Sequence, residues 1–194
     1  MHKIVRAQGV TTSWDHAQKK TKRYREQDSE QVAEYMREMA KVSIEDIAYV
    51  DETGIDAYLY REYGWSKRGS PLVGMVSGRK YKRTGVVAAQ MNGTIISPLQ
   101  YEGTMDSSLF EMWFESHLIP CLLENTVVVM GNASFHRKTR LYPLAQKAGI
   151  RLIFLPPYSP ELNPIEHFWC WLKRELCKIL PSQPSFDDTL RSCF

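Results

Sequence analysis

A run of consecutive apolar residues constrains the fold of this chain more than any other feature. Residues 126–130 read TVVVM, and the run passes directly into glycine and asparagine at positions 131 and 132. A strand with one face in water alternates apolar and polar residues, whereas this segment carries apolar side chains for both faces. We therefore expect a central strand with helices on both sides, in an α/β layered domain with a mixed sheet.

Other segments have the composition of strands. β-Branched and aromatic residues cluster at 47–50 and at 150–155. Residues 84–100 contain two apolar stretches separated by Asn92-Gly93, a pair typical of a two-residue hairpin turn. We expect the first strand to stop at the acids that follow residue 50 and to turn at Gly54, with Asp56 as a further turn residue.

Apolar residues at helical spacing predict the helices. They occur at about 32–39, at 106–120 with Asp106 as a cap, at 138–148, and from residue 163 onward. We expect a basic N-terminal arm at 1–27 and one domain over 28–194. The last residues, DDTLRSCF, barely begin a helix, which is typical of a truncated C-terminus.

Cations are clustered although the formal net charge is only +3. Between residues 67 and 83 there are six cations and no acid, with Trp65 just before them and Tyr81 among them: Lys67, Arg68, Arg79, Lys80, Lys82 and Arg83. Such a segment is typical of one that lies along a phosphate backbone. The alternative is an exposed hairpin that is made soluble by its charge.

The cysteine pattern and the hydropathy exclude other classes of protein. The four cysteines form no Cys-x-x-Cys pair and no zinc-ligand spacing with histidine, so we expect reduced thiols. No apolar run approaches the roughly 18 to 20 residues that span a bilayer, and the N-terminus lacks the apolar centre of a signal peptide. We expect a soluble cytoplasmic protein that contacts no membrane.

Three positions mark a candidate site at the carboxyl edge of the sheet, where open α/β sheets form their sites. Asp51 follows the first strand, Gly131 follows the central strand, and Glu166 stands at the start of the last helix. Glu166 has a structural alternative, because Asn163 as N-cap, Pro164 at the first helical position and Glu166 at the third spell a capping box. A carboxylate at this position is compatible with both roles.

Three blocks of the sequence resemble the signature blocks of DDE transposases of the mariner-like superfamily, specifically bacterial insertion-sequence members. The blocks are YVDETG at 49–54, VVVMGNASFH at 127–136 and LPPYSPELNPIEHFWCWLK at 155–173. The resemblance runs from about Lys19 to the C-terminus and implies an RNase H-like fold, a mixed sheet flanked by helices. Family members carry Asp, Asp and Glu, commonly with 34 residues between the last two. Here 166 − 131 − 1 = 34, so Gly131 stands at the second aspartate position.

The resemblance implies metal-dependent cleavage and strand transfer of double-stranded DNA, with two Mg²⁺ or Mn²⁺ ions. Asp51 would bridge both ions and Glu166 would hold one, but Gly131 offers only backbone. Since hard cations need oxygen ligands, we expect weak metal binding and a catalytically defective domain. The alternative function is a non-catalytic DNA-binding remnant, or a co-opted protein, that keeps this fold. The alternative reason for the glycine is a backbone conformation with positive φ.

Neighbouring residues are expected to support the site rather than to react. Asn132 points away from the direction of residue 131, and Glu52 points away from Asp51, where it is a solvated acid or a group behind the ligands. Tyr158 shapes the turn before the last helix. For His136 and His167 a structural role is the more frequent one for such histidines, and contact with phosphate is the alternative.

The resemblance also implies partners. Transposases of this kind act on element ends and target DNA, and we expect a homo-oligomer on DNA. Related transposases carry an N-terminal helix-turn-helix region. Because too few residues precede Lys19 to form one, we expect sequence-specific recognition either to lie in a separate helix-turn-helix chain or to be lost. The implied location is the bacterial cytoplasm.

Overall fold

The computed structural model describes residues 24–59, 66–67, 69–71, 73–75, 77–79, 81–180 and 185–194. Most of the arm predicted at 1–27 lies outside these residues, as do Arg68 and Lys80 of the basic segment.

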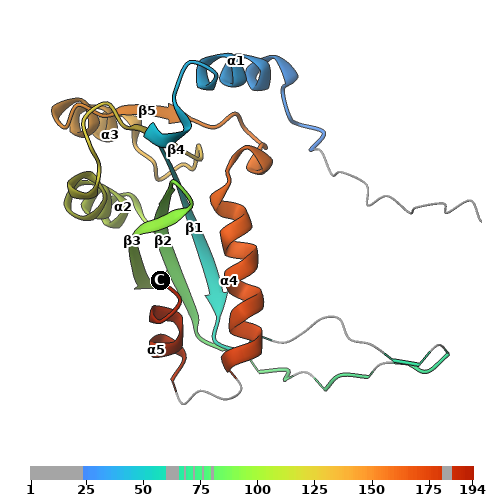
Figure 1. Cartoon of the computed structure of the whole chain (residues 1–194). Coiled ribbons are helices and arrows are strands. Elements are labelled where there is room, and N and C mark those ends of the chain that lie inside the picture. Colours follow the sequence, from blue (N-terminus) through green and yellow to red (C-terminus); the bar gives the residue numbers. More distant parts are fainter. Residues whose placement is uncertain are drawn as a thin grey trace, which may run out of the picture.

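Five strands form one mixed sheet in the order β3-β2-β1-β4-β5 (Figure 1). The strands are β1 (Ile47–Asp56), β2 (Arg83–Met91), β3 (Thr94–Glu102), β4 (Val127–Met130) and β5 (Arg151–Phe154). β1 pairs antiparallel with β2 and parallel with β4, β2 pairs antiparallel with β3, and β4 pairs parallel with β5. The predicted hairpin is confirmed: Asn92 and Gly93 connect β2 to β3, both with positive φ, as a tight hairpin turn requires.

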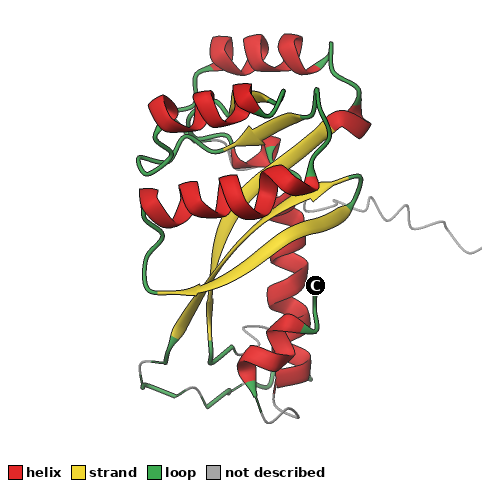
Figure 2. Cartoon of the chain, turned by 90° about the vertical axis from the view of Figure 1, so that its left-hand side faces the viewer, coloured by secondary structure: helices red, strands yellow, loops and turns green. Residues whose placement is uncertain are grey.

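Helices lie on both faces of the sheet (Figures 1 and 2). They are α1 (Ser29–Met39), α2 (Ser107–Trp113), α3 (Lys138–Lys147), α4 (Ile165–Ile179) and α5 (Phe186–Arg191). α2 continues through a π-helical turn to Leu118 and a 3₁₀ turn that contains Pro120. The predicted cap of α2 is confirmed, because the Asp106 carboxylate accepts a hydrogen bond from the Leu109 backbone N–H at 2.8 Å.

β4 is the covered central strand that its sequence predicts. Val128 and Met130 pack with the core side chains of α2 and α3, whereas Val127 and Val129 pack with Tyr35 of α1 on the other face. All four β4 side chains are at most 4% exposed. Full burial of a side chain of this size contributes about 1.5–3 kcal/mol, so the two-sided apolar pattern is what holds this strand in the middle of the sheet.

The predicted end of the first strand is wrong. β1 does not stop at Asp51 but runs five residues further, because β2 remains paired with it as far as Asp56 opposite Arg83. The predicted turn residue Gly54 lies inside the strand, and a Cβ there would come within 2.2 Å of Arg83 Nε. β4 ends opposite Val50, so Asp51 stands in mid-strand, at the point where its parallel neighbour stops.

Among the helices in the described residues, none combines the length and the apolar composition that a membrane crossing requires. All four cysteines lie in the described part of the chain, and they are thiols, as their spacing predicts.

Candidate active site

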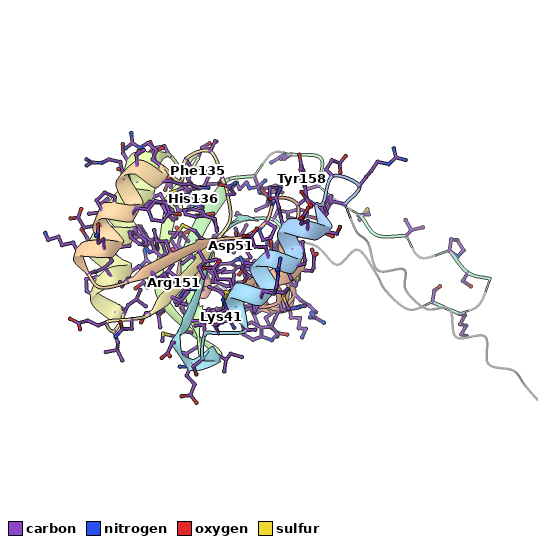
Figure 3. All side chains as sticks on the ribbon, turned by 90° about the horizontal axis from the view of Figure 1, so that it is seen from above. Lys41, Asp51, Phe135, His136, Arg151 and Tyr158 are labelled. Carbon is purple, nitrogen blue, oxygen red and sulfur yellow. The ribbon has the colours of Figure 1, made fainter. Side chains whose placement is uncertain are left out.

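The structure brings the three candidate positions to one cavity. Asp51 in β1, Gly131 just after β4 and Glu166 in the first turn of α4 all line a cavity of about 420 Å³. The segment between β5 and α4, which includes Tyr158, forms another wall of this cavity. Figure 3 looks down on this end of the molecule and shows Asp51 between His136 and Tyr158.

Two hydrogen-bond donors hold the Asp51 carboxylate, whereas its surroundings disfavour its negative charge. It accepts hydrogen bonds from the Trp169 indole N–H at 3.1 Å and from the backbone N–H of Glu52. Burial, and then the negative charges of Glu166 and Glu52, raise the pKa of Asp51 to about 7. A bound cation would offset the repulsion between these carboxylates and the cost of burying the charge of Asp51.

The capping-box interpretation of Glu166 is wrong. In such a box the Glu166 carboxylate would accept a hydrogen bond from the backbone N–H of Asn163. That N–H donates instead to the Pro160 carbonyl at 3.0 Å. The side chain of Asn163 caps nothing either, because its Nδ2 donates to the Val50 carbonyl of β1 at 3.3 Å. Asn163 is 4% exposed, and its Oδ1 is buried without a partner among the described residues. Asn163 therefore joins the start of α4 to β1, and Glu166 is left to line the cavity.

The conformation of Gly131 does not explain why glycine is present. Four described glycines have positive φ, at positions 69, 93, 103 and 149, and Gly131 is not one of them. A Cβ at Gly131 would meet no described heavy atom within 4 Å, apart from those of the neighbouring residues. The alternative reason for the glycine, a backbone conformation with positive φ, is thus wrong for this position, which has room for a side chain.

His136 has a structural role beside Gly131. The residue is 5% exposed, and its ring lies 4.1 Å from the ring of Phe110, centroid to centroid. Nδ1 lies 2.7 Å from the carbonyl oxygen of Gly131, and Nε2 lies 3.1 Å from Oε1 of Glu52. Because a carbonyl oxygen can only accept, Nδ1 carries a hydrogen and donates it to Gly131. The imidazole therefore ties the segment after β4 to β1.

Glu52 and two of the other predicted supporting residues have defined places. Glu52 is not a solvated acid: its side chain is only 15% exposed and anchors His136. Asn132 is exposed and lines the same cavity as Asp51. Tyr158 is exposed at the cavity wall, has φ +56°, and packs its ring 6.0 Å from that of Tyr24. His167 is exposed on α4 and lies outside the described lining of the cavity.

The basic segment lies away from this cavity. Its described residues run outward from the ends of β1 and β2, beyond the last turn of α4 (Figure 1). Lys67 and Arg79 are exposed, whereas Lys82 pairs with Glu102 at 2.6 Å. Tyr81 is exposed and stacks on Tyr58 with ring centroids 4.7 Å apart. The cluster is therefore a peripheral surface rather than a wall of the candidate site.

One contact in the site involves a residue that the sequence did not mark as a candidate. The apolar spacing of the last helix predicts only that Trp169 is buried, yet its indole N–H donates to Asp51. The available signal was spacing, because a residue three positions after Glu166 lies on the same side of a helix.

Known proteins resemble this chain in sequence and in fold. A family model described as DDE superfamily endonuclease matches residues 46–188. The Tc1 transposase of Caenorhabditis elegans is 33% identical over 88 residues, which are 43% of this chain and 32% of that protein.

Solved structures extend the match over most of the fold. The Mos1 strand transfer complex superposes with a TM-score of 0.69 at 15% identity, over 92% of this chain and 57% of that one. The mariner Mos1 paired end complex with Mg gives 0.68 at 15% identity, over 91% and 58%. The likeness confirms the predicted RNase H-like fold. The chain spans about a third of the Tc1 transposase and under three fifths of the Mos1 chains.

Proposed function

The chain belongs to the DDE superfamily endonucleases, and we propose on that basis that it is the catalytic domain of a transposase. Its reaction would be metal-dependent cleavage and strand transfer of double-stranded DNA during transposition. The observation that carries the proposal is the meeting of Asp51, Glu166 and position 131 in one cavity. The three come from separate parts of the chain, so their shared cavity follows from the tertiary structure and not from sequence proximity.

The donor set fits a divalent cation in part. Two carboxylates, Asp51 and Glu166, line the cavity, and carboxylate oxygens are the ligands that Mg²⁺ and Mn²⁺ prefer. Within the described residues no cluster of three acids, histidines or cysteines has the geometry of a metal site. When bound, two such ions neutralise charge on the attacking and leaving oxygens at phosphorus. Asp51 and Glu166 would hold one ion, and the second ion, which would share Asp51, would lack the carboxylate expected at position 131.

The backbone of Gly131 is a poor substitute for the missing carboxylate. Its carbonyl, the one oxygen that the residue has, already accepts a hydrogen bond from His136. Two carboxylates supply about two negative charges against the four positive charges of two divalent ions. We therefore infer that the second ion binds weakly and that this domain is catalytically impaired.

DNA is the proposed partner. The Mos1 proteins of similar fold are described in a strand transfer complex and in a paired end complex, and exposed cations of the basic segment, such as Lys67 and Arg79, suit a phosphate backbone. We further propose a homo-oligomer on DNA, with the element ends recognised by a helix-turn-helix unit outside this domain.

A second function is favoured by the glycine itself. Without the third carboxylate, the fold and the basic segment would still suit a non-catalytic DNA-binding protein. The two functions differ in what an added carboxylate does, because only a catalytic site with one missing ligand regains metal binding from it.

The test is Gly131→Asp, with Gly131→Asn as the matched control that adds the same shape without the charge. Mn²⁺ and Mg²⁺ affinity would be measured by titration calorimetry, and nicking of a supercoiled plasmid would report cleavage. We expect the aspartate form to bind metal at least tenfold more tightly and to nick DNA, and the asparagine form to do neither. Unchanged metal affinity together with no nicking in Gly131→Asp would defeat the missing-ligand account.

A further inference from the structure

Two hydrogen bonds reach consecutive residues of β1, one from Asn163 just before α4 and one from Trp169 within α4. Asn163 Nδ2 donates to the Val50 carbonyl at 3.3 Å, and Trp169 Nε1 donates to Asp51 Oδ2 at 3.1 Å. Both donors are buried, with Asn163 4% and Trp169 1% exposed. The segment that leads into α4 thus holds the backbone just before Asp51, and α4 itself holds the Asp51 carboxylate.

Packing fixes the indole of Trp169 in place. The side chain belongs to the core that α4 forms with β2, together with Ala88 and Leu172. Ala88 is the residue of β2 that stands opposite Asp51 in the sheet register. A large ring in a close-packed core has few alternative rotamers, so its N–H keeps one direction. The indole N–H of Trp169 is therefore a rigid donor, and its hydrogen bond restricts the rotamers that the Asp51 carboxylate can adopt.

Trp169 also shares a helix face with Glu166. The two residues are three positions apart, which places them on the same side of α4. A single rigid helix therefore carries one carboxylate of the cavity and the donor that holds the other one. The relative placement of Asp51 and Glu166 depends on this helix in two independent ways.

We propose that Trp169 is a positioning residue for the metal site: its indole N–H holds Oδ2 of Asp51, so that Oδ1 is presented to a divalent cation shared with Glu166. This inference rests on the proposed function, because it concerns the same cavity. Ligating carboxylates are commonly oriented by such outer hydrogen bonds, and loss of one typically weakens metal affinity by about 10- to 100-fold. A purely structural tryptophan would affect folding stability alone.

The test compares Trp169→Phe with Trp171→Phe, each in the Gly131→Asp form. The first variant keeps an aromatic ring in the core and removes the N–H, while the second makes the same change at a residue of the same helix that is 44% exposed. Mn²⁺ affinity would be measured by calorimetry and folding by thermal melting. We expect affinity to fall about tenfold or more in Trp169→Phe and to stay unchanged in Trp171→Phe. A lower melting temperature with unchanged Mn²⁺ affinity would overturn the proposal.

A second measurement needs no change at Trp169. With ¹⁵N-labelled indoles in Gly131→Asp, addition of Mg²⁺ should shift the Trp169 N–H resonance. The resonance of Trp113, a buried indole that donates to the Ser97 carbonyl, should not move. Calorimetric Mg²⁺ binding without a shift at Trp169 would contradict the positioning role alone. Absence of any Mg²⁺ or Mn²⁺ binding would reject the proposed function, and this inference with it.

Discussion

The environment of Asp51 disfavours the ionised form of its carboxyl group. It is buried, two other carboxylates lie near it, and the pKa of its carboxyl is raised to about 7 in consequence. The hydrogen bonds from Trp169 and from the Glu52 backbone offset only part of this effect. An ionised carboxylate in such a place lowers the stability of the folded chain above neutral pH. The same excess of negative charge favours binding of a cation.

The pH dependence of stability follows from that shift. Since the folded pKa of Asp51, about 7, exceeds the ordinary value of 3.8, its contribution to stability is fully present below about pH 4 and is lost as pH rises toward 7. Asp51→Asn should therefore stabilise the metal-free chain by a few kcal/mol at pH 8 and by clearly less at pH 5, at about 1.4 kcal/mol per pKa unit. Urea unfolding at both pH values measures this. The control is Asp56→Asn, at an exposed position of the same strand, and an equal gain at both pH values would contradict the burial of the charge.

At the scale of elements, β1 and β2 are shaped by a pair of glycines that face each other. Gly54 and Gly85 are partners in the sheet register. A Cβ on Gly54 would touch the guanidinium of Arg83, and a Cβ on Gly85 would come within 2.2 Å of the Tyr101 ring. These glycines leave room for side chains that lie across the strands. The site depends on them indirectly, because β1 stays extended past Asp51 only while it remains paired with β2.

The two glycines should respond differently to alanine. In Gly85→Ala the methyl group meets an aromatic ring, and we expect a loss of about 1–3 kcal/mol, as for other overpacked sites. In Gly54→Ala it meets the flexible end of Arg83, which can move away, so the loss should be smaller. Denaturant unfolding of both variants gives these values. A double-mutant cycle with Tyr101→Ala should recover most of the Gly85→Ala loss, and an unrelieved loss would locate the strain elsewhere.

At the scale of the whole molecule, the candidate site and the basic segment lie in different places. The cavity is at the start of α4, whereas the described residues of the basic segment leave the sheet beyond the end of that helix (Figure 1). A DNA contact at the segment would position the duplex on the protein rather than take part in the chemistry. Phosphate contacts of this kind carry no sequence information.

Binding of duplex DNA should accordingly be steeply salt-dependent and nearly independent of sequence. Neutralising Arg79, Lys80, Lys82 and Arg83 together should weaken binding and flatten the plot of log affinity against log salt by about 0.9 per lost phosphate contact. Because Lys82 already pairs with Glu102, its share should be the smaller one. Fluorescence anisotropy between low and moderate salt measures the slope. Neutralising four cations elsewhere (Lys41, Lys147, Arg174 and Lys178) is the control, and equal effects of both sets would move the DNA contact off this segment.

Local patterns in the sequence were enough to predict much of the fold. The apolar run of β4 specifies burial on both faces, Asn92-Gly93 specifies a tight turn, and Asp106 caps the helix that follows it. In each case the decisive interaction lies within a few residues or depends on composition alone. The spacing between Gly131 and Glu166 also marked the candidate positions, through the resemblance to the DDE transposases.

The tertiary structure decided what lies between distant residues. Asn163 contacts Val50 across 113 positions and Trp169 contacts Asp51 across 118, so a helix-capping pattern read locally assigned Asn163 the wrong partner. β1 continues past Asp51 only because β2 pairs with it there, and no signal within β1 itself shows this. The sequence by itself determined which residue types are present and in what order. Packing determined which of their hydrogen bonds form, since a donor binds the acceptor that the folded chain brings to it and not the nearest one in sequence.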